Sequence, residues 1–346
     1  MTKHYKKRKF KFSLKTFCCF IIFEFVFTAI TAPFILLYGP FKVAKKTYVG
    51  AAMTTLSHQW LATTFLSEER INNILNSSSE EEQNTENTYD IENTSAKVTL
   101  PVKTDNTMQL YSFGNSKYKG YYLIISDPKR IFIGYSKYLG DQGQTVSQMA
   151  KESRAVAAIN GGAFHDESTK DSLDSSKEQW NGNGGQADGV IISDGQVKFS
   201  NVPKDKKTEV FAMTKDGEML AGKYTLKQLK DRNVVNAVSF YPTLVKNGHA
   251  TGSSIELEKW GIGPRTAIGQ RADGAIVFMV IEGRSITSPG ASLKELQGLL
   301  IEKTHVVTAI NLDGGRSSTL YLNGKVVNKL SSNIGERCLP SSILVK

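Results

Sequence analysis

The chain has 346 residues and few of the side chains that build disulfide or zinc sites. It holds 3 cysteines and 5 histidines, too few cysteines for a disulfide scaffold. Cys18 and Cys19 fall within an apolar segment, so Cys338 has no intramolecular partner in the rest of the chain. The histidines are scattered and form no H-E-x-x-H pattern, so no metal site and no cofactor are predicted, although a bound divalent metal is left open.

Several sequence motifs of nucleotide binding and hydrolysis are also missing. The stretch GNGG at 182–185 does not complete G-x-G-x-x-G, and neither G-x-x-x-x-G-K-[ST] nor G-x-S-x-G occurs. Their absence removes the usual sequence evidence for a dinucleotide-binding fold, a P-loop protein or an α/β-hydrolase. Apolar residues make up 40% of the chain and aromatic residues 10%, which is enough for a hydrophobic core.

The net charge of +10 is divided into blocks along the chain. Residues 1–46 carry +9, residues 68–92 carry −7, and residues 93–346 carry +8. Each block has its own explanation, as a membrane topology signal, an acidic spacer and a cationic domain. The basic tail precedes an apolar segment and the body has no nucleic-acid motif, so nucleic acid is not predicted as a partner.

The N-terminal region is predicted to anchor the chain in a membrane. Residues 17–38 are mostly apolar with one charge, at Glu24, and about 20 such residues span a bilayer core as a helix. The preceding basic residues place the N-terminus in the cytoplasm and the body outside. A signal peptide cleaved near Ala29–Ala32 is the alternative. The expected segments are a basic cytoplasmic tail (1–16), a transmembrane signal-anchor (17–38), an amphipathic stalk helix that permits a homodimer (39–75), a disordered acidic linker (76–96) and one catalytic domain (97–346).

The last segment shows short strands separated by turn residues, with few helices. Hairpins are expected in YYLIISDPKRIFIGYSK, in ADGVIISDGQVKFS, in TAIGQRADGAIVFMVIEG and in STLYLNGKVVNK. Helices are expected at Ser147–Arg154, Thr225–Arg232 and Ser292–Lys303, the last with a capping box of Ser292 and Glu295. This balance predicts a strand-dominated α+β domain.

Four segments rich in glycine follow or flank apolar strands and carry polar side chains. They are AVAAINGGAF (155–164), GPRTAIG (263–269), FMVIEGRS (278–285) and VVTAINLDGGRSSTL (306–320). In the last, an apolar strand leads to Asp313 and a Gly-Gly turn, where backbone and hydroxyl groups can approach a ligand. Taken alone, each segment is also compatible with a structural turn, and each arginine with a surface ion pair.

In this order, the segments resemble the phosphodiester glycosidase family over roughly residues 97–346. The stretch after Gly335, ERCLPSSILV, is loosely similar to the family's closing pattern. The chain departs from the family pattern at Ala163, Glu282, Arg316 and Ser342, which bears on substrate choice but leaves both carboxylates in place.

The resemblance implies hydrolysis of a sugar-1-phosphodiester by carboxylates with help from cations. Asp313 and Glu282 are the expected base or nucleophile, because glycoside cleavage normally uses two carboxyl groups. Four arginines would stabilise the phosphate leaving group, and two asparagines would orient sugar hydroxyls. The predicted substrate-binding residues are Asn160, Gly161, Gly162, Arg265, Arg284, Asn311, Gly314, Gly315, Arg316, Ser317, Ser318 and Arg337.

The expected partner is an anionic sugar-phosphate polymer or glycan of a cell envelope, and the predicted source is a Gram-positive bacterium. Two alternatives remain open at this point. One is a non-catalytic module that binds a sugar-phosphate polymer, and the other is a glycosidase without phosphate specificity.

Overall fold

The computed structural model describes residues 14–53, 59–76, 98–100, 105–165, 183–285, 287–332 and 334–346. The chain separates into two compact units, Met1–Glu86 and Asn87–Lys346, and each is described by itself. Most of the predicted basic tail and nearly all of the predicted acidic linker lie outside the described residues.

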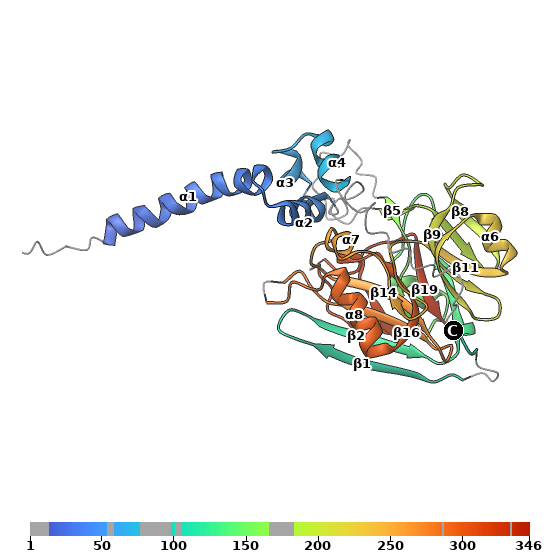
Figure 1. The fold of residues 1–346 in the computed structure, drawn as a ribbon. Coiled ribbons are helices and arrows are strands. Elements are labelled where there is room, and N and C mark those ends of the chain that lie inside the picture. The colour runs from blue at the N-terminus through green and yellow to red at the C-terminus, as the bar shows by residue number, and fades with distance from the viewer. Residues whose placement is uncertain are drawn as a thin grey trace, which may run out of the picture. The chain divides into compact units, whose positions relative to one another are not determined.

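The first unit is helical and begins with α1 (Leu14–Tyr38), which is long and apolar enough to cross a membrane (Figure 1). Residues 39–75, predicted as one stalk helix, contribute to three helices, which are α2 (Lys42–Met53), α3 (Trp60–Thr63) and α4 (Glu68–Asn76). Their small core contains Leu37, Val49, Ala52, Ala62, Leu66 and Ile71. Trp60 at the start of α3 lies outside this core and is 58% exposed.

The second unit is built on three antiparallel sheets and a two-stranded ribbon. The seven-stranded sheet has the order β1 (Met108–Gly114), β2 (Lys119–Ile125), β15 (Ile276–Ile281), β14 (Arg265–Arg271), β16 (Val306–Leu312), β12 (Thr243–Lys246) and β13 (His249–Ala250). One five-stranded sheet has the order β10 (Met219–Tyr224), β9 (Thr208–Thr214), β11 (Val234–Ser239), β7 (Val190–Ser193) and β8 (Gln196–Ser200). The other has the order β18 (Lys325–Val326), β17 (Leu320–Leu322), β4 (Ala157–Asn160), β19 (Ser341–Val345) and β3 (Ile131–Tyr135), and the ribbon pairs β5 (Phe164–His165) with β6 (Gln186–Ala187).

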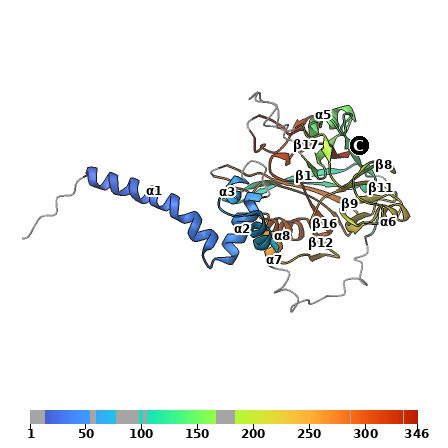
Figure 2. The ribbon, with the colours of Figure 1, turned by 90° about the horizontal axis from the view of Figure 1, so that it is seen from above.

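The three sheets share one core, and helices cover their outer faces. On β15, Phe278 and Val280 enter the shared core, whereas Val277 and Met279 pack toward α8 (Leu293–Thr304). Both faces of this strand are therefore buried, which explains its unbroken apolar sequence. Figure 2 shows α8 beside β16 and α5 (Val146–Glu152) beside β17. The remaining helices are α6 (Leu226–Asp231) and α7 (Ser254–Glu258).

The α+β prediction is confirmed, as are three of the four predicted hairpins. These are β7–β8, β14–β15 and β17–β18, and the turn residues Asp194 and Asn323 have positive φ. The first hairpin prediction is wrong, because β2 and β3 lie in different sheets. Asp127 caps a short 3-10 helix (Pro128–Arg130) between them, and β2 pairs instead with β1 and β15.

The three helices expected in this unit are all present, and the cap residues explain where they begin. Thr145, Thr225 and Ser292 each accept a hydrogen bond from the backbone three residues on, and each helix has a complete capping box. Such caps satisfy N–H groups that the helix itself leaves unpaired.

Candidate active site

Three of the four glycine-rich segments meet at one edge of the large sheet. Strand β14 begins at Arg265, which pairs with Ile281 at the end of β15, and Thr266 pairs with Leu312 at the end of β16. Glu282 and Asp313 therefore leave the sheet on either side of the start of β14. With strands about 4.8 Å apart, their backbones are separated by about 10 Å.

The fourth segment reaches this edge from a different sheet through the side chain of Asn160. Its Nδ2 donates to the carbonyl oxygen of Asp313 at 2.7 Å. Its Oδ1 accepts from Thr266 Oγ1 at 2.9 Å and from the N–H of Thr319 at 3.3 Å. Asn160 is fully buried, so it fixes the Asp313 loop. Both polar atoms of its side-chain amide therefore bind protein groups in this structure.

The carboxyl group of Asp313 has a pKa well above its ordinary value. Burial raises the pKa of Asp313 to about 6. The Ser317 hydroxyl, the N–H of Gly314 and the charge of Arg284 oppose this shift and keep the pKa from rising further. A carboxyl with a pKa near neutrality exchanges a proton readily at physiological pH.

One guanidinium group, that of Arg284, lies close to this carboxyl, and that of Arg316 lies close to Arg284. Arg284 has a φ of 60°. Its positive charge lowers the pKa of Asp313 and so favours the ionised carboxylate. The positive charge of Arg316 lowers the pKa of Arg284. The Arg284 guanidinium packs so tightly over Gly315 that a Cβ there would lie 2.9 Å from Nη2. Burial is the main cause that lowers the pKa of both Arg284 and Arg316. Two partly desolvated guanidinium groups that lie close to each other, only one of them paired with a carboxylate, make a site suited to an anion.

Arg265 and Glu282 lie at the same edge, but their side chains form hydrogen bonds with backbone groups of the protein. Arg265 donates to the carbonyls of Ala291 at 2.9 Å, Trp260 at 2.8 Å and Gly261 at 2.5 Å. Burial, and then the charge of Arg284, lower the pKa of Arg265 to about 10. Glu282 Oε1 accepts from the N–H of Lys329 at 2.6 Å. Both side chains hold neighbouring loops in place.

The predicted glycines at 161 and 162 serve close packing of the backbone. A Cβ on Gly161 would lie 2.4 Å from Ser341 Oγ, and one on Gly162 would lie 2.7 Å from the carbonyl oxygen of Ser239. Arg337 lies over the ring of Phe164 at 4.8 Å, and this contact joins it to the first segment.

Unpaired buried polar atoms gather on the segments around Asp313. Ser288 Oγ, Asn311 Oδ1 and Ser318 Oγ have no hydrogen-bond partner among the described residues. Asn311 uses its Nδ2 to bind the carbonyl oxygen of Tyr241 at 2.9 Å. Each unpaired buried atom costs about 1–3 kcal/mol unless water or a ligand binds it, so such atoms favour a ligand site here.

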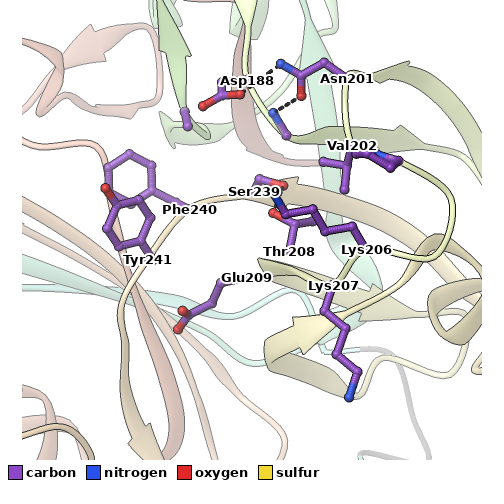
Figure 3. Close-up of a pocket in the computed structure, with 13 residues that line it drawn as sticks. Asp188, Asn201, Val202, Lys206, Lys207, Thr208, Glu209, Ser239, Phe240 and Tyr241 are labelled. Atoms are coloured by element: carbon purple, nitrogen blue, oxygen red, sulfur yellow. Dashed lines mark hydrogen bonds between the residues drawn. The ribbon is translucent and has the colours of Figure 1, made fainter. Parts of the chain in front are cut away.

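A groove of about 280 Å³ opens next to this edge, and the sequence analysis did not predict it (Figure 3). Among the described residues, none of the predicted site residues lines it. The lining includes Ala163, Asp188, Asn201, Lys206, Lys207, Glu209, Ser239, Phe240 and Tyr241. In the sequence, the signal for this groove is the pair of aromatic residues Phe240 and Tyr241 before Pro242, and this pair belongs to none of the motifs described above. Within the described ranges, no group of three or more potential metal ligands is found.

The fold has three antiparallel sheets, and an acid with a raised pKa lies beside a guanidinium group at the strand ends. The chain belongs to the phosphodiester glycosidase family, whose sequence model matches residues 153–346. It is similar to the SPbeta prophage-derived uncharacterized protein YomE of Bacillus subtilis (strain 168), with 29% identity over 219 residues, covering 61% of this chain and 31% of that protein.

Eukaryotic proteins are also similar to this chain. The N-acetylglucosamine-1-phosphodiester alpha-N-acetylglucosaminidase of Bos taurus is 27% identical over 200 residues, covering 53% of this chain and 34% of that one. The chain thus spans about a third of the length of these relatives. The zebrafish catalytic domain of the same name, auto-inhibited by its pro-peptide, has a TM-score of 0.55 at 20% identity, covering 72% of this chain and 86% of that one. That likeness confirms the fold.

The pKa of Asp313 predicts how stability depends on pH. Because the folded-state pKa of about 6 exceeds the ordinary 3.8, the folded state binds the proton more tightly. The free energy of unfolding should therefore fall as pH rises from about 4 to 6, by up to about 3 kcal/mol. The Asp313→Asn variant lacks this loss, so in urea unfolding it should be more stable than the parent at pH 7.5. At pH 4 the two should nearly coincide, and an equal difference at both pH values would contradict the prediction.

Proposed function

We propose that the second unit hydrolyses the bond between a sugar's anomeric carbon and a phosphodiester. The observation that carries this proposal is the pairing of Asp313, whose pKa is raised to about 6, with the guanidinium group of Arg284, to which Arg316 adds a neighbouring positive charge. Family membership supports it. Such a substrate carries its negative charge on the leaving group, so the site needs cations there more than a strong acid.

In this proposal, Asp313 acts as a general base toward a water molecule. The water oxygen bonds to the anomeric carbon, the bond from that carbon to the phosphate oxygen breaks, and the water proton passes to Asp313 and then to solvent. The oxocarbenium-like transition state places growing negative charge on the phosphate. Arg284 and Arg316 stabilise that charge.

Three other predicted residues position this centre. Asn160 holds the carbonyl oxygen of Asp313, Arg265 holds the carbonyls of the loop that precedes β14, and Glu282 holds the N–H of Lys329. Because carboxyl placement within about 0.5 Å decides activity, these residues contribute through geometry. Glu282 is accordingly the weaker of the two candidates for a direct role.

We further propose that α1 anchors the chain in a cell membrane with its N-terminus in the cytoplasm and the second unit outside. The length and apolar character of α1 support the anchor, and the basic residues before it support the orientation. The substrate is then an anionic sugar-phosphate polymer or glycan of the envelope of a Gram-positive bacterium. The helices that follow α1 permit a homodimer.

Release of free sugar tests the proposed activity. The full chain in detergent would be incubated with the methyl diester of N-acetylglucosamine 1-phosphate, with a sugar-1-phosphate polymer and with neutral glycosides. We expect reducing sugar from the diesters and none from the neutral glycosides. Binding of the polymer without release would favour a non-catalytic module, and release from neutral glycosides alone would favour a different glycosidase.

A further inference from the structure

The groove described above is connected to Asp313 by two separate chain segments. Asn160, whose side chain binds the carbonyl oxygen of Asp313, is followed three residues later by Ala163, which lines the groove. Asn311 lies two residues before Asp313, and its side chain binds the carbonyl oxygen of Tyr241, which also lines the groove. Two residues of strand span about 7 Å, and a paired strand lies about 5 Å away. The groove therefore begins about 10 Å from the acid.

The end of the groove nearest to Asn311 is an aromatic platform. Tyr241 is 55% exposed, yet its ring is supported by Trp260 at 5.2 Å and by Phe240 at 5.8 Å between ring centroids. Figure 3 shows the rings of Phe240 and Tyr241 together at one end of the groove. A supported and exposed ring offers apolar area at little entropic cost, which suits the flat face of a sugar.

The opposite end of the groove offers positive charge. Lys206 and Lys207 lie there (Figure 3), and among the described residues no carboxylate lies within ion-pair distance of either. The two acids of the groove already have partners. Asp188 binds Asn201 at 2.9 Å and His165 at 3.3 Å, and Glu209 binds both the N–H and the hydroxyl of Thr243. These contacts hold the two carboxylates in place but do not remove their charge, so the cationic groups available to a ligand are the two lysines at this end of the groove.

We propose that this groove binds the unit of an anionic sugar-phosphate chain that adjoins the bond being cleaved. The sugar of that unit stacks on Tyr241, and its phosphodiester lies by Lys206 and Lys207. The inference rests on the proposed function and sharpens it, because it makes a polymer of several units, and not a single sugar-phosphate diester, the preferred substrate.

The test compares a short and a long substrate on the full chain in detergent. The probes are the methyl diester of N-acetylglucosamine 1-phosphate and a four-unit oligomer of N-acetylglucosamine 1-phosphate. Tyr241→Ala, and Lys206→Ala combined with Lys207→Ala, should each lower kcat/KM for the oligomer about tenfold more than for the methyl diester. Tyr241→Phe should restore the oligomer value, because it keeps the ring.

Matched controls come from the same chain. Lys204→Ala removes a charge from the same loop outside the groove lining, and Tyr111→Ala removes a tyrosine on β1 that is 41% exposed. Neither should change the ratio of the two kcat/KM values. Equal losses on both substrates in the groove variants would overturn the proposal.

A calorimetric titration with the same oligomer separates this inference from the proposed activity. If neither probe is hydrolysed, oligomer binding that weakens with salt and is lost in the Tyr241→Ala and lysine variants upholds the groove and refutes only the activity. Oligomer binding that ignores these variants, or no binding by the parent chain, overturns the groove assignment whatever the activity.

Discussion

Replacing Asp313 with asparagine should lower kcat on a sugar-1-phosphodiester by about a thousandfold, the middle of the range for a lost general base. The amide has nearly the same shape and stays in the same hydrogen-bond surroundings, but it cannot take up a proton from water. Substrate affinity should change much less, because the amide keeps the site intact and reduces its negative charge. Single-turnover kinetics and a binding titration would measure the two effects.

The control for this variant is Asp273→Asn, in the turn at the opposite end of the β14–β15 hairpin. Asp273 pairs with Arg271 at 2.9 Å and is largely exposed, so its loss should leave kcat within about twofold, as expected for an exposed ion pair. If Asp313→Asn keeps full turnover, Asp313 is not the base. If it loses turnover but also loses its fold by circular dichroism, Asp313→Glu provides the second test, since it keeps the charge and should retain part of the activity.

The second large effect is expected for Arg284→Gln. Loss of one preorganised charge at a developing anion should lower kcat by about a hundredfold. The variant also predicts a shift in the pH profile. Because the charge of Arg284 lowers the pKa of Asp313, its removal should raise that pKa, and the acidic limb of kcat/KM should move to higher pH.

Arg271→Gln serves as the matched control, since it removes an arginine from the far end of β14, the strand that pairs with β15, and Arg284 follows β15. It should change neither kcat nor the pH profile beyond the effect of an exposed ion pair. A fall in kcat for Arg284→Gln with an unmoved acidic limb would contradict the placement of its charge beside Asp313. Similar losses in the two arginine variants would point to a general effect of charge on the sheet.

The position of the acid could be predicted from the sequence, because it depends on local patterns. Apolar runs that end in Glu282-Gly283 and Asp313-Gly314 indicate strands with polar ends, and the Asp273-Gly274 turn sets the register of β14 against β15. Antiparallel pairing of β14 with β16 then brings both acids to one edge. The strand ends and the hairpin need only apolar runs and turn chemistry, whereas the pairing of β14 with β16 is non-local and comes from the structure.

The roles of Asn160, Arg265 and Tyr241 could not be predicted in the same way. Asn160 acts across two sheets, and its partner Asp313 is 153 residues away. Arg265 looks like an anion ligand in the sequence, but loop carbonyls from Trp260 and Gly261 occupy its guanidinium. Tyr241 becomes a candidate for stacking against a ligand only because Phe240 and Trp260 pack against its ring. Non-local strand pairing likewise explains why β2 and β3, adjacent in sequence, join different sheets, since β2 pairs with β15 and β3 pairs with β19.

The contact between Asn160 and Asp313 also governs when the site exists during folding. The acid takes its final place only after a strand of the small sheet and a strand of the large sheet have met, and closing such a long loop is slow. A chain cut between these two residues and separated would contain every site residue in its two pieces and yet have no organised centre. The proposed activity would therefore be absent until the whole domain has folded.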